Sequence, residues 1–565
     1  MRYALLPLML TVSLLTGCGS TVVNPVTGQA ERSVMSEQAE IAEGAKAHQE
    51  VLKEYGVVKD ARVQTYVNNL GQRLAKLSHR DQLQWHFTVL DSPEINAFAL
   101  PGGYVYVTRG IMAYLQSEAE LAGVMGHEIG HVTARHGAQR ATRQQDAGLG
   151  VLAATVLGAV LESQGVSGAG RLASDVSQTA AAGYIASYGR DQELQADTLG
   201  AEYLARSAYN PRNMVKVIAA LKDQERFAAD QARAAGRTAP TGNRWLASHP
   251  SNDQRLQQIT QLADQYRGNY VDEGRARYLQ AVSGLTFGDS AEQGLTRGQN
   301  FYHPTLGIAL TAPAGWTIQN DAEQLALVNA AGDAGLLVQV APKQAGRDHD
   351  AVIRNLIKPS QGNSQRLTLN GLSATRFIGS RANAQGQTQG VDVTLVTGPS
   401  NLIYLLRAVA KNAAALKVAN PALVQAQGSF HAITAAERNA ARPWLLKTAA
   451  FPTGGFAQLA RSSPLSNAER QLRLLNGFYA GGTPAVGQLV KVVEKRWRLQ
   501  DNPARAQHLH HHLPVLCAGF VRLPGCAAAH VAVGGNSRTQ RLCAVFCPAL
   551  HALPLWCDDA NRAVA

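Results

Sequence analysis

Residues 127–131 read His-Glu-Ile-Gly-His and continue a helix-favouring stretch from Ser117 to Met125, SEAELAGVM. On an α-helix, positions i and i+4 lie on one face, so His127 and His131 can turn ring nitrogens toward the same metal ion. Glu128 reaches the same cleft and is not required as a ligand. This spacing is typical of zinc hydrolases, in which two imidazoles hold Zn²⁺ and the carboxylate accepts a proton from a water molecule that the metal activates.

A catalytic zinc ion needs a third protein ligand and one open position. Glu193 and Asp197 are also four residues apart, in the stretch YGRDQELQADTLGAEYLA. We expect Glu193 to be the third ligand and Asp197 to hydrogen-bond the far nitrogen of a ligand histidine, which would fix its tautomer. The alternative is a solvated acidic helix face. Apolar residues that give this helix a buried side weigh against it, namely Ala196, Leu199, Ala201, Tyr203 and Leu204.

Together these motifs resemble the HtpX/BepA-type zinc metallopeptidases, a family that also contains the CAAX prenyl proteases. HEIGHVTARH is followed by ELQAD, and three further pieces match in the expected order: NPVTG at Asn24–Gly28, DSPEINAFALPGGYVYVTRG at Asp91–Gly110, and SHPSNDQR at Ser248–Arg255. The resemblance covers about residues 20 to 270. It implies a mainly α-helical zincin domain with a small β-sheet and endopeptidase activity.

The same resemblance implies a set of site residues. One Zn²⁺ per chain would be held by His127, His131 and Glu193, with Glu128 as the general base. None of these four positions departs from the family pattern.

The segment from Asn96 to Val107 alternates and carries β-branched and aromatic residues, which predicts a hairpin that turns at Pro101-Gly102-Gly103. Peptide substrates bind proteases by adding a strand to an exposed sheet edge. The candidate edge comprises Asn96, Ala97, Phe98 and Ala99. The alternative is an internal strand of an ordinary sheet.

Two further histidines lie close to the motifs. His136 follows the second zinc histidine and precedes Gly137, so we interpret it as a cation in the last turn of the zinc helix, with the glycine as its cap. His249 precedes Pro250, which places it in an extended turn. We hypothesise that His249 is a fourth ligand that holds the enzyme latent. The alternative is a loop histidine that only hydrogen-bonds.

The N-terminus indicates the compartment. A basic start and a short apolar core, Ala4 to Leu15, lead to Leu15-Thr16-Gly17-Cys18. This resembles a lipoprotein signal peptide over residues 1–17, with lipidation of Cys18 and a linker over residues 18–45. Gly19 and Ser20 do not signal inner-membrane retention, so we expect a periplasmic protein tethered by lipid to the outer membrane. A soluble secreted protein, or a buried Cys18, is the alternative.

Composition and length set the wider limits. A chain of 565 residues, with 45% hydrophobic and 17% charged residues, predicts a globular protein of about three or four domains. The net charge of +12 has no aromatic-interleaved basic stripe, so no nucleic-acid partner is expected. We place the zinc metallopeptidase domain at residues 46–272. Within it, residues 147–161 are expected to form a buried or cleft-covering helix. Residues 164–171 are expected to form either a flexible glycine-rich loop over the site or a plain surface connection.

Short strands follow the peptidase region, interrupted by one helix from Asp350 to Ile357, so residues 300–435 are predicted to form a mixed α/β domain. Its start resembles the PsbP-like fold. Residues 440–495 resemble a LysM-type βααβ module, although Thr-Gly-Gly stands where Gly-Asp-Thr is usual. Peptidoglycan binding and another purpose for a small βααβ domain both stay open.

Residues 496–565 hold four histidines near their start and five of the six cysteines. The cysteine count is odd and no ligand spacing is evident, so we expect a poorly ordered tail rather than a metal site or disulfide framework.

Two classes of function follow from the sequence. The first is a zinc endopeptidase for protein quality control, which degrades misfolded or stalled envelope proteins. The second is an envelope-assembly chaperone or peptidoglycan-binding factor that keeps the peptidase fold as a scaffold. The intact Glu128 favours the first, because a scaffold has no need of a base beside two ligands.

Overall fold

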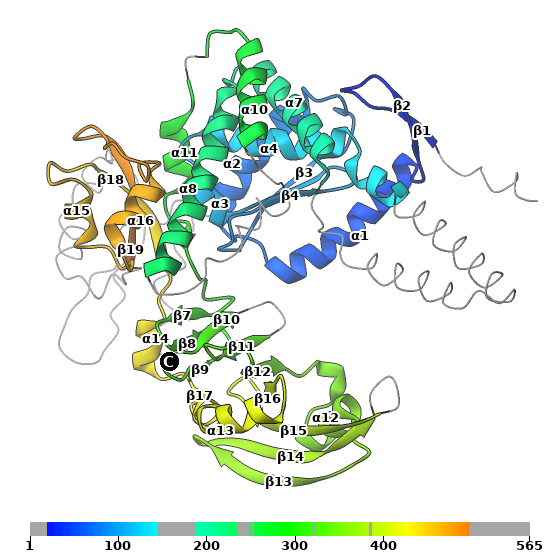
Figure 1. The fold of residues 1–565 in the computed structure, drawn as a ribbon, viewed down its shortest axis with the longest axis vertical. Helices are drawn as coiled ribbons and strands as arrows, with labels where there is room; N and C mark the ends of the chain where they lie inside the picture. The colour runs from blue at the N-terminus through cyan, green and yellow to red at the C-terminus, as the bar shows by residue number, and fades with distance from the viewer. Residues whose placement is uncertain are drawn as a thin grey trace, which may run out of the picture. The chain divides into compact units, whose positions relative to one another are not determined.

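The computed structural model describes residues 20–143, 188–234, 249, 253–270, 272–320, 324–382 and 387–495. The predicted signal peptide with Cys18, the helix and loop between residues 147 and 171, and the tail from residue 496 lie outside the described residues. Within the described residues, no helix has both the length and the apolar character needed to cross a membrane. The chain is multidomain, with a helical part followed by several sheets (Figure 1).

The helical part includes the range predicted for the peptidase domain, residues 46–272, and extends beyond it at both ends. Its helices are α1 (Glu37–Tyr55), α2 (Ala61–Ala75), α3 (Arg109–Tyr114), α4 (Glu118–Thr133), α7 (Arg190–Arg206), α8 (Arg212–Ala234), α10 (Asp253–Gln265) and α11 (Arg275–Val282). A three-stranded sheet completes it, with β3 (His86–Leu90) parallel to β5 (Tyr104–Thr108) and β4 (Ala97–Leu100) antiparallel to β5. The predicted hairpin over Asn96 to Val107 is therefore present.

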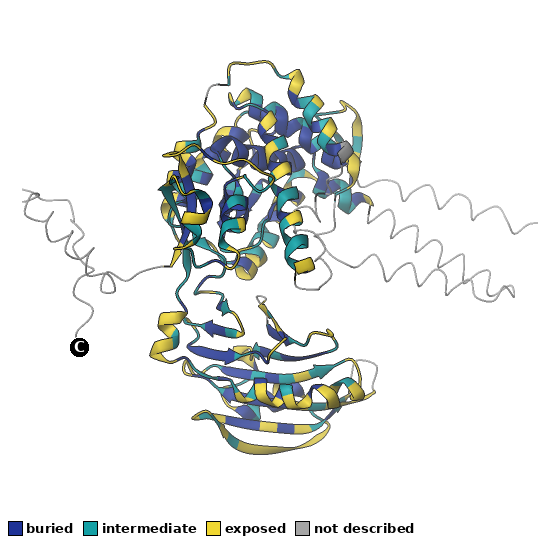
Figure 2. Cartoon of the chain, turned by 60° about the vertical axis from the view of Figure 1, so that its left-hand side comes forward, coloured by how far each residue is buried: buried dark blue, intermediate teal, exposed yellow. Residues whose placement is uncertain are grey.

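Helix α4 begins where the sequence predicts. The side chain of Ser117 accepts a hydrogen bond from the backbone N–H of Glu120 at 3.2 Å and so caps the helix. Every residue of α4 is buried, and Figure 2 shows buried residues concentrated in the helical part of the chain. A helix that is buried on all sides is usually apolar, and any buried polar group needs a hydrogen-bond partner. The polar residues of α4 must therefore find partners inside the protein.

Helices α4 and α7 touch backbone to backbone. A Cβ atom added at Gly130 would lie 2.8 Å from the carbonyl oxygen of Ala196, and one at Gly200 would lie 3.0 Å from the backbone nitrogen of His127. The first distance is shorter than real Cβ contacts and the second is tighter than nearly all of them, so a side chain at either glycine would force the two helices to shift. The close approach brings the acidic residues of α7 within reach of the histidines of α4.

The segment predicted as a linker over residues 18–45 is folded from residue 20 onward. It contains the hairpin of β1 (Ser20–Val23) and β2 (Ala30–Ser33) and the first turns of α1. Asn24 closes the hairpin turn, since its side-chain oxygen accepts from the N–H groups of Val26 and Thr27 at 2.9 and 3.2 Å. The linker expectation is corrected here, because it took no account of the turn chemistry of NPVTG.

The second part is richer in strands than the predicted α/β domain suggests. A seven-stranded antiparallel sheet has the order β10 (Thr317–Asn320), β11 (Leu325–Val328), β12 (Ala334–Val340), β16 (Ile403–Ala410), β15 (Thr388–Thr397), β14 (Leu372–Ala382), β13 (Gln361–Leu369). A four-stranded sheet has the order β17 (His431–Ala432), β9 (Ile308–Thr311), β8 (Asn300–His303), β7 (Leu295–Arg297). The outermost strand β13 is largely exposed, and Figure 2 shows the exposed margin of this sheet.

Few helices accompany these sheets. The helix predicted over 350–357 is present as α12 (His349–Val352) followed by a π-helical turn (Ile353–Ile357). Helix α13 (Ala413–Gly428) contacts β12 and β16, and α14 (Ala435–Ala440) follows β17.

The third part has the predicted strand–helix–helix–strand order: β18 (Trp444–Ala450), α15 (Gly455–Ala460), α16 (Ala468–Leu475) and β19 (Leu489–Lys495). Strand β18 also pairs with β6 (Thr286–Phe287), which follows the peptidase helices. One hydrophobic cluster contains residues of this module, such as Phe456 and Leu475, together with residues of α3 and α4, such as Ile111 and Leu121. The module is thus continuous with the peptidase core.

A buried lysine joins the module to the end of α3, just before α4. Lys491 on β19 is fully buried, and its Nζ donates to the carbonyl oxygens of Ala113 and Leu115, each at 2.6 Å. These are carbonyls at the C-terminal end of α3, which a cation suits. Burial lowers the pKa of Lys491 well below its usual value, against the opposing charge of Glu120 on α4.

Lys491→Ala should lower the free energy of unfolding by about 2–4 kcal/mol, because two buried carbonyls lose their donor and a cavity is left. Chemical denaturation of the full chain measures this. Lys495→Ala, at an exposed position of the same strand, is the matched control and should change stability little. Equal stability of the two variants would contradict the docking role of Lys491.

Candidate metal centre

Three predicted ligand residues meet between α4 and α7. The Nε2 atoms of His127 and His131 are 3.0 Å apart. The carboxylate of Glu193 lies 3.6 Å from His127 Nε2 through Oε2 and 3.4 Å from His131 Nε2 through Oε1. All three side chains are buried. Their ligand atoms and that of His249 lie within 4.8 Å of one another, which is a grouping that could hold a metal ion.

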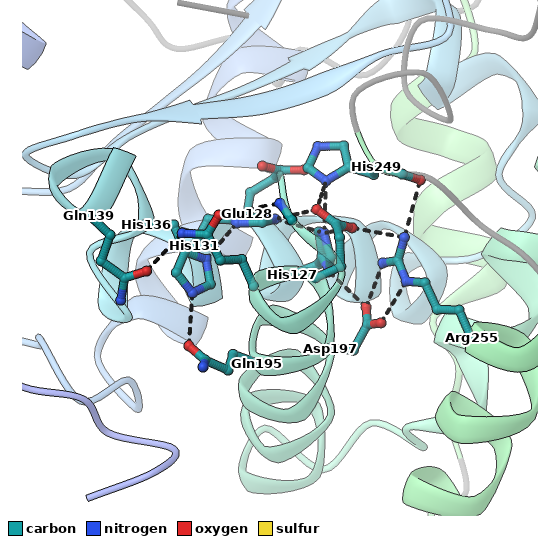
Figure 3. Close-up of polar contacts among 12 residues, drawn as sticks. His127, Glu128, His131, His136, Gln139, Gln195, Asp197, His249 and Arg255 are labelled. Carbon is teal, nitrogen blue, oxygen red and sulfur yellow. Dashed lines mark hydrogen bonds and ion pairs between the residues drawn. The ribbon is translucent and has the colours of Figure 1, made fainter. Parts of the chain in front are cut away.

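His249 reaches this cluster from the chain segment that precedes α10 (Figure 3). Its Nδ1 lies 2.9 Å from Glu193 Oε1 and 3.2 Å from His127 Nε2, and its Nε2 lies 3.5 Å from Glu128 Oε1. Burial disfavours the charged imidazole, but the carboxylates of Glu193 and Glu128 outweigh it and raise the pKa of His249. The loop histidine therefore stands among the ligand groups.

Asp197 orients the first histidine. Its Oδ1 lies 2.8 Å from Nδ1 of His127, so the other ring nitrogen, Nε2, faces the cluster. A ligand histidine is held in this way when its far nitrogen donates to a carboxylate. Burial alone would raise the pKa of Asp197, but the charge and hydrogen bonds of Arg255 and the contact with His127 lower it.

Arg255 balances the buried carboxylates. It lies 2.8 Å from each oxygen of Asp197 through Nη2 and Nε, and its Nη1 lies 2.8 Å from Glu193 Oε2. Burial raises the pKa of Glu193, but the nearby imidazoles outweigh it and hold that pKa well below its usual value. The sequence motif SHPSNDQR contains Arg255 but predicts no role for it, because nothing local to the motif signals a partner on α7.

The interpretation of His136 as a cation at the helix end is wrong. Helix α4 ends at Thr133, Arg135 adopts the left-handed φ of 56°, and residues 136–143 are helical again. His136 is fully buried, and burial lowers its pKa to about 4, so the ring is neutral. Its Nδ1 lies 2.8 Å from Nδ1 of His131 and its Nε2 lies 3.0 Å from Oε1 of Gln195 (Figure 3).

The aromatic ring of Tyr188 covers one face of the His131 imidazole. Its ring stacks on His131 with the centroids 3.8 Å apart and the planes 21° from parallel. The guanidinium of Arg140 lies 4.5 Å from the centroid of the tyrosine ring. A stacked ring restricts the rotation of the imidazole, and a cation over an aromatic face is itself attractive. The sequence carries no local signal for this contact, because Tyr188 and His131 are far apart along the chain.

The candidate substrate strand lies at a sheet edge. Among the described strands the order is β3-β5-β4, so β4 pairs with β5 on one side only. Ala97, Phe98 and Ala99 belong to β4, whereas Asn96 precedes it and is buried, its N–H donating to Thr108 Oγ1 at 3.2 Å. A small pocket is lined by Ala99 and Leu100 of this strand together with His131 and Tyr188, among others.

These features, two histidines and a glutamate on adjacent helices beside an edge strand, define a metallopeptidase type of site. Residues 61–263 match Peptidase family M48. The resemblance to the HtpX/BepA-type metallopeptidases is confirmed for these residues.

The chain is similar to curated proteins of two kinds. It is 30% identical over 240 residues to the Beta-barrel assembly-enhancing protease of Escherichia coli (strain K12), covering 42% of this chain and 47% of that protein. It is 29% identical over 243 residues to the protein of the same name from Yersinia pestis, covering 43% and 48%. It is 28% identical over 235 residues to Mitochondrial metalloendopeptidase OMA1 of Arabidopsis thaliana, covering 41% and 42%. The chain thus spans about half the length of the curated relatives it matches.

Among solved structures, the chain is similar to cyanobacterial PsbP (CyanoP) from Synechocystis sp. PCC 6803. The likeness has a TM-score of 0.18 and 13% sequence identity, and it covers 25% of this chain and 98% of that one. The PsbP-like fold of residues 300–435 and the LysM likeness of residues 440–495 stay predictions.

Proposed function

We propose that this protein is a zinc-dependent endopeptidase of the bacterial periplasm, tethered to the outer membrane, which degrades misfolded or stalled envelope proteins. One observation carries the proposal: His127, His131 and Glu193 converge between two helices, with Glu128 beside them and an edge strand alongside.

The donor set fits one zinc ion per chain. Two imidazole nitrogens and a carboxylate oxygen are the ligands that catalytic zinc takes in several hydrolases, with one position left open. Asp197 turns His127 so that its Nε2 faces the cluster, and Glu193 is held ionised by its neighbours. The residues present therefore supply ligands in the protonation states that zinc requires.

A bound zinc ion would act as a Lewis acid, activating water and polarising the scissile carbonyl. Glu128 has the place of the general base, because its side chain points into the same cluster, 3.5 Å from His249 Nε2. It would accept a proton from the attacking water and return it to the leaving amine. Main-chain pairing with β4 would hold the substrate extended, and the buried walls of the site would exclude bulk water.

The proposed location of the protein and its proposed substrates rest on two separate observations. The predicted lipidation of Cys18 would anchor the chain to the membrane through its N-terminal lipid. The name of the Escherichia coli relative links that protein to β-barrel assembly, which favours unfolded or misassembled envelope proteins as substrates here. Peptidoglycan is a further candidate partner, through residues 440–495.

His131→Ala and Glu193→Ala should each strongly reduce the zinc bound per chain, because each removes one of three ligands. Metal analysis of purified, folded protein measures this. Asp191→Ala, at an exposed position of the same helix as Glu193, should keep wild-type zinc content. Full zinc occupancy in either ligand variant would refute the assignment.

Glu128→Gln should keep the fold and the zinc but lower the proteolysis rate by about 10²–10⁴-fold, because an amide cannot accept the proton from water. Casein hydrolysis with and without a chelator measures it. A rate near wild type would remove Glu128 as the base. A wild-type protein that holds zinc but cleaves nothing would favour the scaffold function instead. Glu128→Gln is also the variant of choice for trapping natural substrates.

His249→Ala should raise the proteolysis rate at matched zinc content. The imidazole stands among the ligand groups, so as a fourth ligand it would exclude water and substrate until its segment moves. The comparison is between His249→Ala and wild type under identical metal loading. An unchanged or lower rate would count against the latch and would instead fit a histidine that orders the site.

A further inference from the structure

The N-terminal hairpin reaches the metal centre through a side-chain amide. Asn24, in the NPVTG turn, is buried, and its Nδ2 donates to Gln195 Oε1 and to Glu31 Oε1, each at 2.9 Å. Gln195 belongs to α7, two residues after the predicted ligand Glu193. A residue of the hairpin is therefore bonded directly to the helix that carries a ligand.

The same oxygen of Gln195 serves a second donor. It lies 3.0 Å from Nε2 of His136, and Nδ1 of His136 lies 2.8 Å from Nδ1 of His131. Figure 3 shows His136 between Gln195 and His131, and Nε2 of His131 faces His127. A continuous chain of contacts thus runs from Asn24 through Gln195 and His136 to His131.

The direction of each hydrogen bond in this chain is fixed from its outer end. The oxygen of Asn24 is committed to the backbone N–H groups of Val26 and Thr27, so its NH₂ must face Gln195. An NH₂ group only donates, so Gln195 presents its oxygen at that point. The amide orientations therefore follow from backbone donors, whose direction is certain.

The tautomers of both histidines follow. Because Gln195 presents an acceptor, Nε2 of His136 carries a hydrogen, and the neutral ring keeps a lone pair on Nδ1. That lone pair accepts from Nδ1–H of His131. His131 then has its lone pair on Nε2, the atom that faces His127 and Glu193. The second histidine is thereby oriented by an amide chain, as the first is by Asp197.

A second set of contacts holds the hairpin in place. Glu31 accepts from Asn24 through Oε1 and from Gln139 Nε2 through Oε2 at 2.6 Å. Gln139 Oε1 in turn accepts from Nε2 of Gln192 at 2.7 Å. The hairpin is therefore bonded both to α7 and to the helical segment that carries His136, so it cannot shift relative to one without straining the other.

We propose that Asn24 and Gln195 are positioning residues for metal binding, and that they act by setting the tautomer of His131 through His136. The N-terminal hairpin is then part of the metal centre, although it precedes the residues matched by the family. This inference rests on the proposed zinc site.

The test uses the full chain and zinc alone, with affinity measured by competition against a chromogenic chelator. Gln195→Leu removes the acceptor at nearly constant size and should weaken zinc affinity by about 10–100-fold, the usual cost of losing an outer partner of a metal ligand. Gln195→Glu keeps an acceptor at the same place and, at mildly alkaline pH, should retain most of the affinity. The visible spectrum of the cobalt-substituted protein should differ from wild type in Gln195→Leu and should not differ in Gln195→Glu.

The hairpin's part is tested by Asn24→Ala, with Thr27→Ala as the matched control in the same turn. Asn24→Ala should weaken zinc affinity, and Thr27→Ala, whose side chain is exposed, should not. The effects of Asn24→Ala and Gln195→Leu should be less than additive when combined, because both act through one chain of contacts.

The outcomes separate this inference from the proposed function. If the wild-type chain holds no zinc, the proposed function fails. If the wild type holds zinc and folded Gln195→Leu binds it as tightly, with an unchanged cobalt spectrum, the tautomer chain is refuted. Equal losses of zinc affinity in Gln195→Leu and Gln195→Glu would also refute it. If the losses of zinc affinity caused by Asn24→Ala and Gln195→Leu were fully additive in the double variant, the role of the hairpin would be refuted.

Discussion

The backbone contact between α4 and α7 is the constraint on which the site depends. Gly130 lies inside the metal motif and faces Ala196, and Gly200 faces the backbone of His127. A single methyl group at either glycine would push the helices apart by tenths of an ångström or more. Since ligand positions must hold to about half an ångström, this would separate Glu193 from the two imidazoles. The glycine between the two zinc histidines is thus as much a part of the site as they are.

That contact brings several charged groups into a buried space, and the burial has to be compensated. Glu193 and Asp197 are both almost fully buried, and Arg255 contacts both of them with its planar fork. A buried carboxylate without such a partner would take up a proton, and a protonated glutamate is a poor metal ligand. Arg255 therefore matters less for stability than for keeping Asp197 ionised, whereas the neighbouring imidazoles hold down the pKa of Glu193, because buried ion pairs contribute little net folding energy.

The sequence predicted the parts of the site that follow from helical periodicity. Spacings of four placed His127 beside His131 and Glu193 beside Asp197, and the alternation around Pro101 predicted the hairpin that includes β4. The contacts of Arg255 and Gln195, which it missed, join segments distant in the sequence. Arg255 pairs with α7, and Gln195 with Asn24, without any local pattern that encodes the pairing.

The prediction that His136 is a cation at the end of the helix is wrong for a related reason. Local rules place a basic residue before glycine at a helix C-terminus, but the left-handed turn at Arg135 folds the chain back and buries the ring. That turn is held by Arg135 itself, whose side chain bonds Glu40 at 2.6 Å and the carbonyl of Met35 at 3.0 Å, both far away in the sequence. Tertiary contacts thus override the local preference.

The residues that match the M48 family end at 263 and begin at 61, yet the structure attaches segments from outside that range to both ends of the zinc helix. At the N-terminal end, Lys491 of the βααβ module holds the carbonyls that precede α4. Toward the C-terminal end, the hairpin contacts His131 through Gln195 and His136. A helix fixed at both ends can keep two ligands and a base in register while substrate binds at the neighbouring edge strand. The residues that position α4 therefore extend beyond the matched residues, and a displacement of the hairpin or of the βααβ module would reach α4 through these contacts.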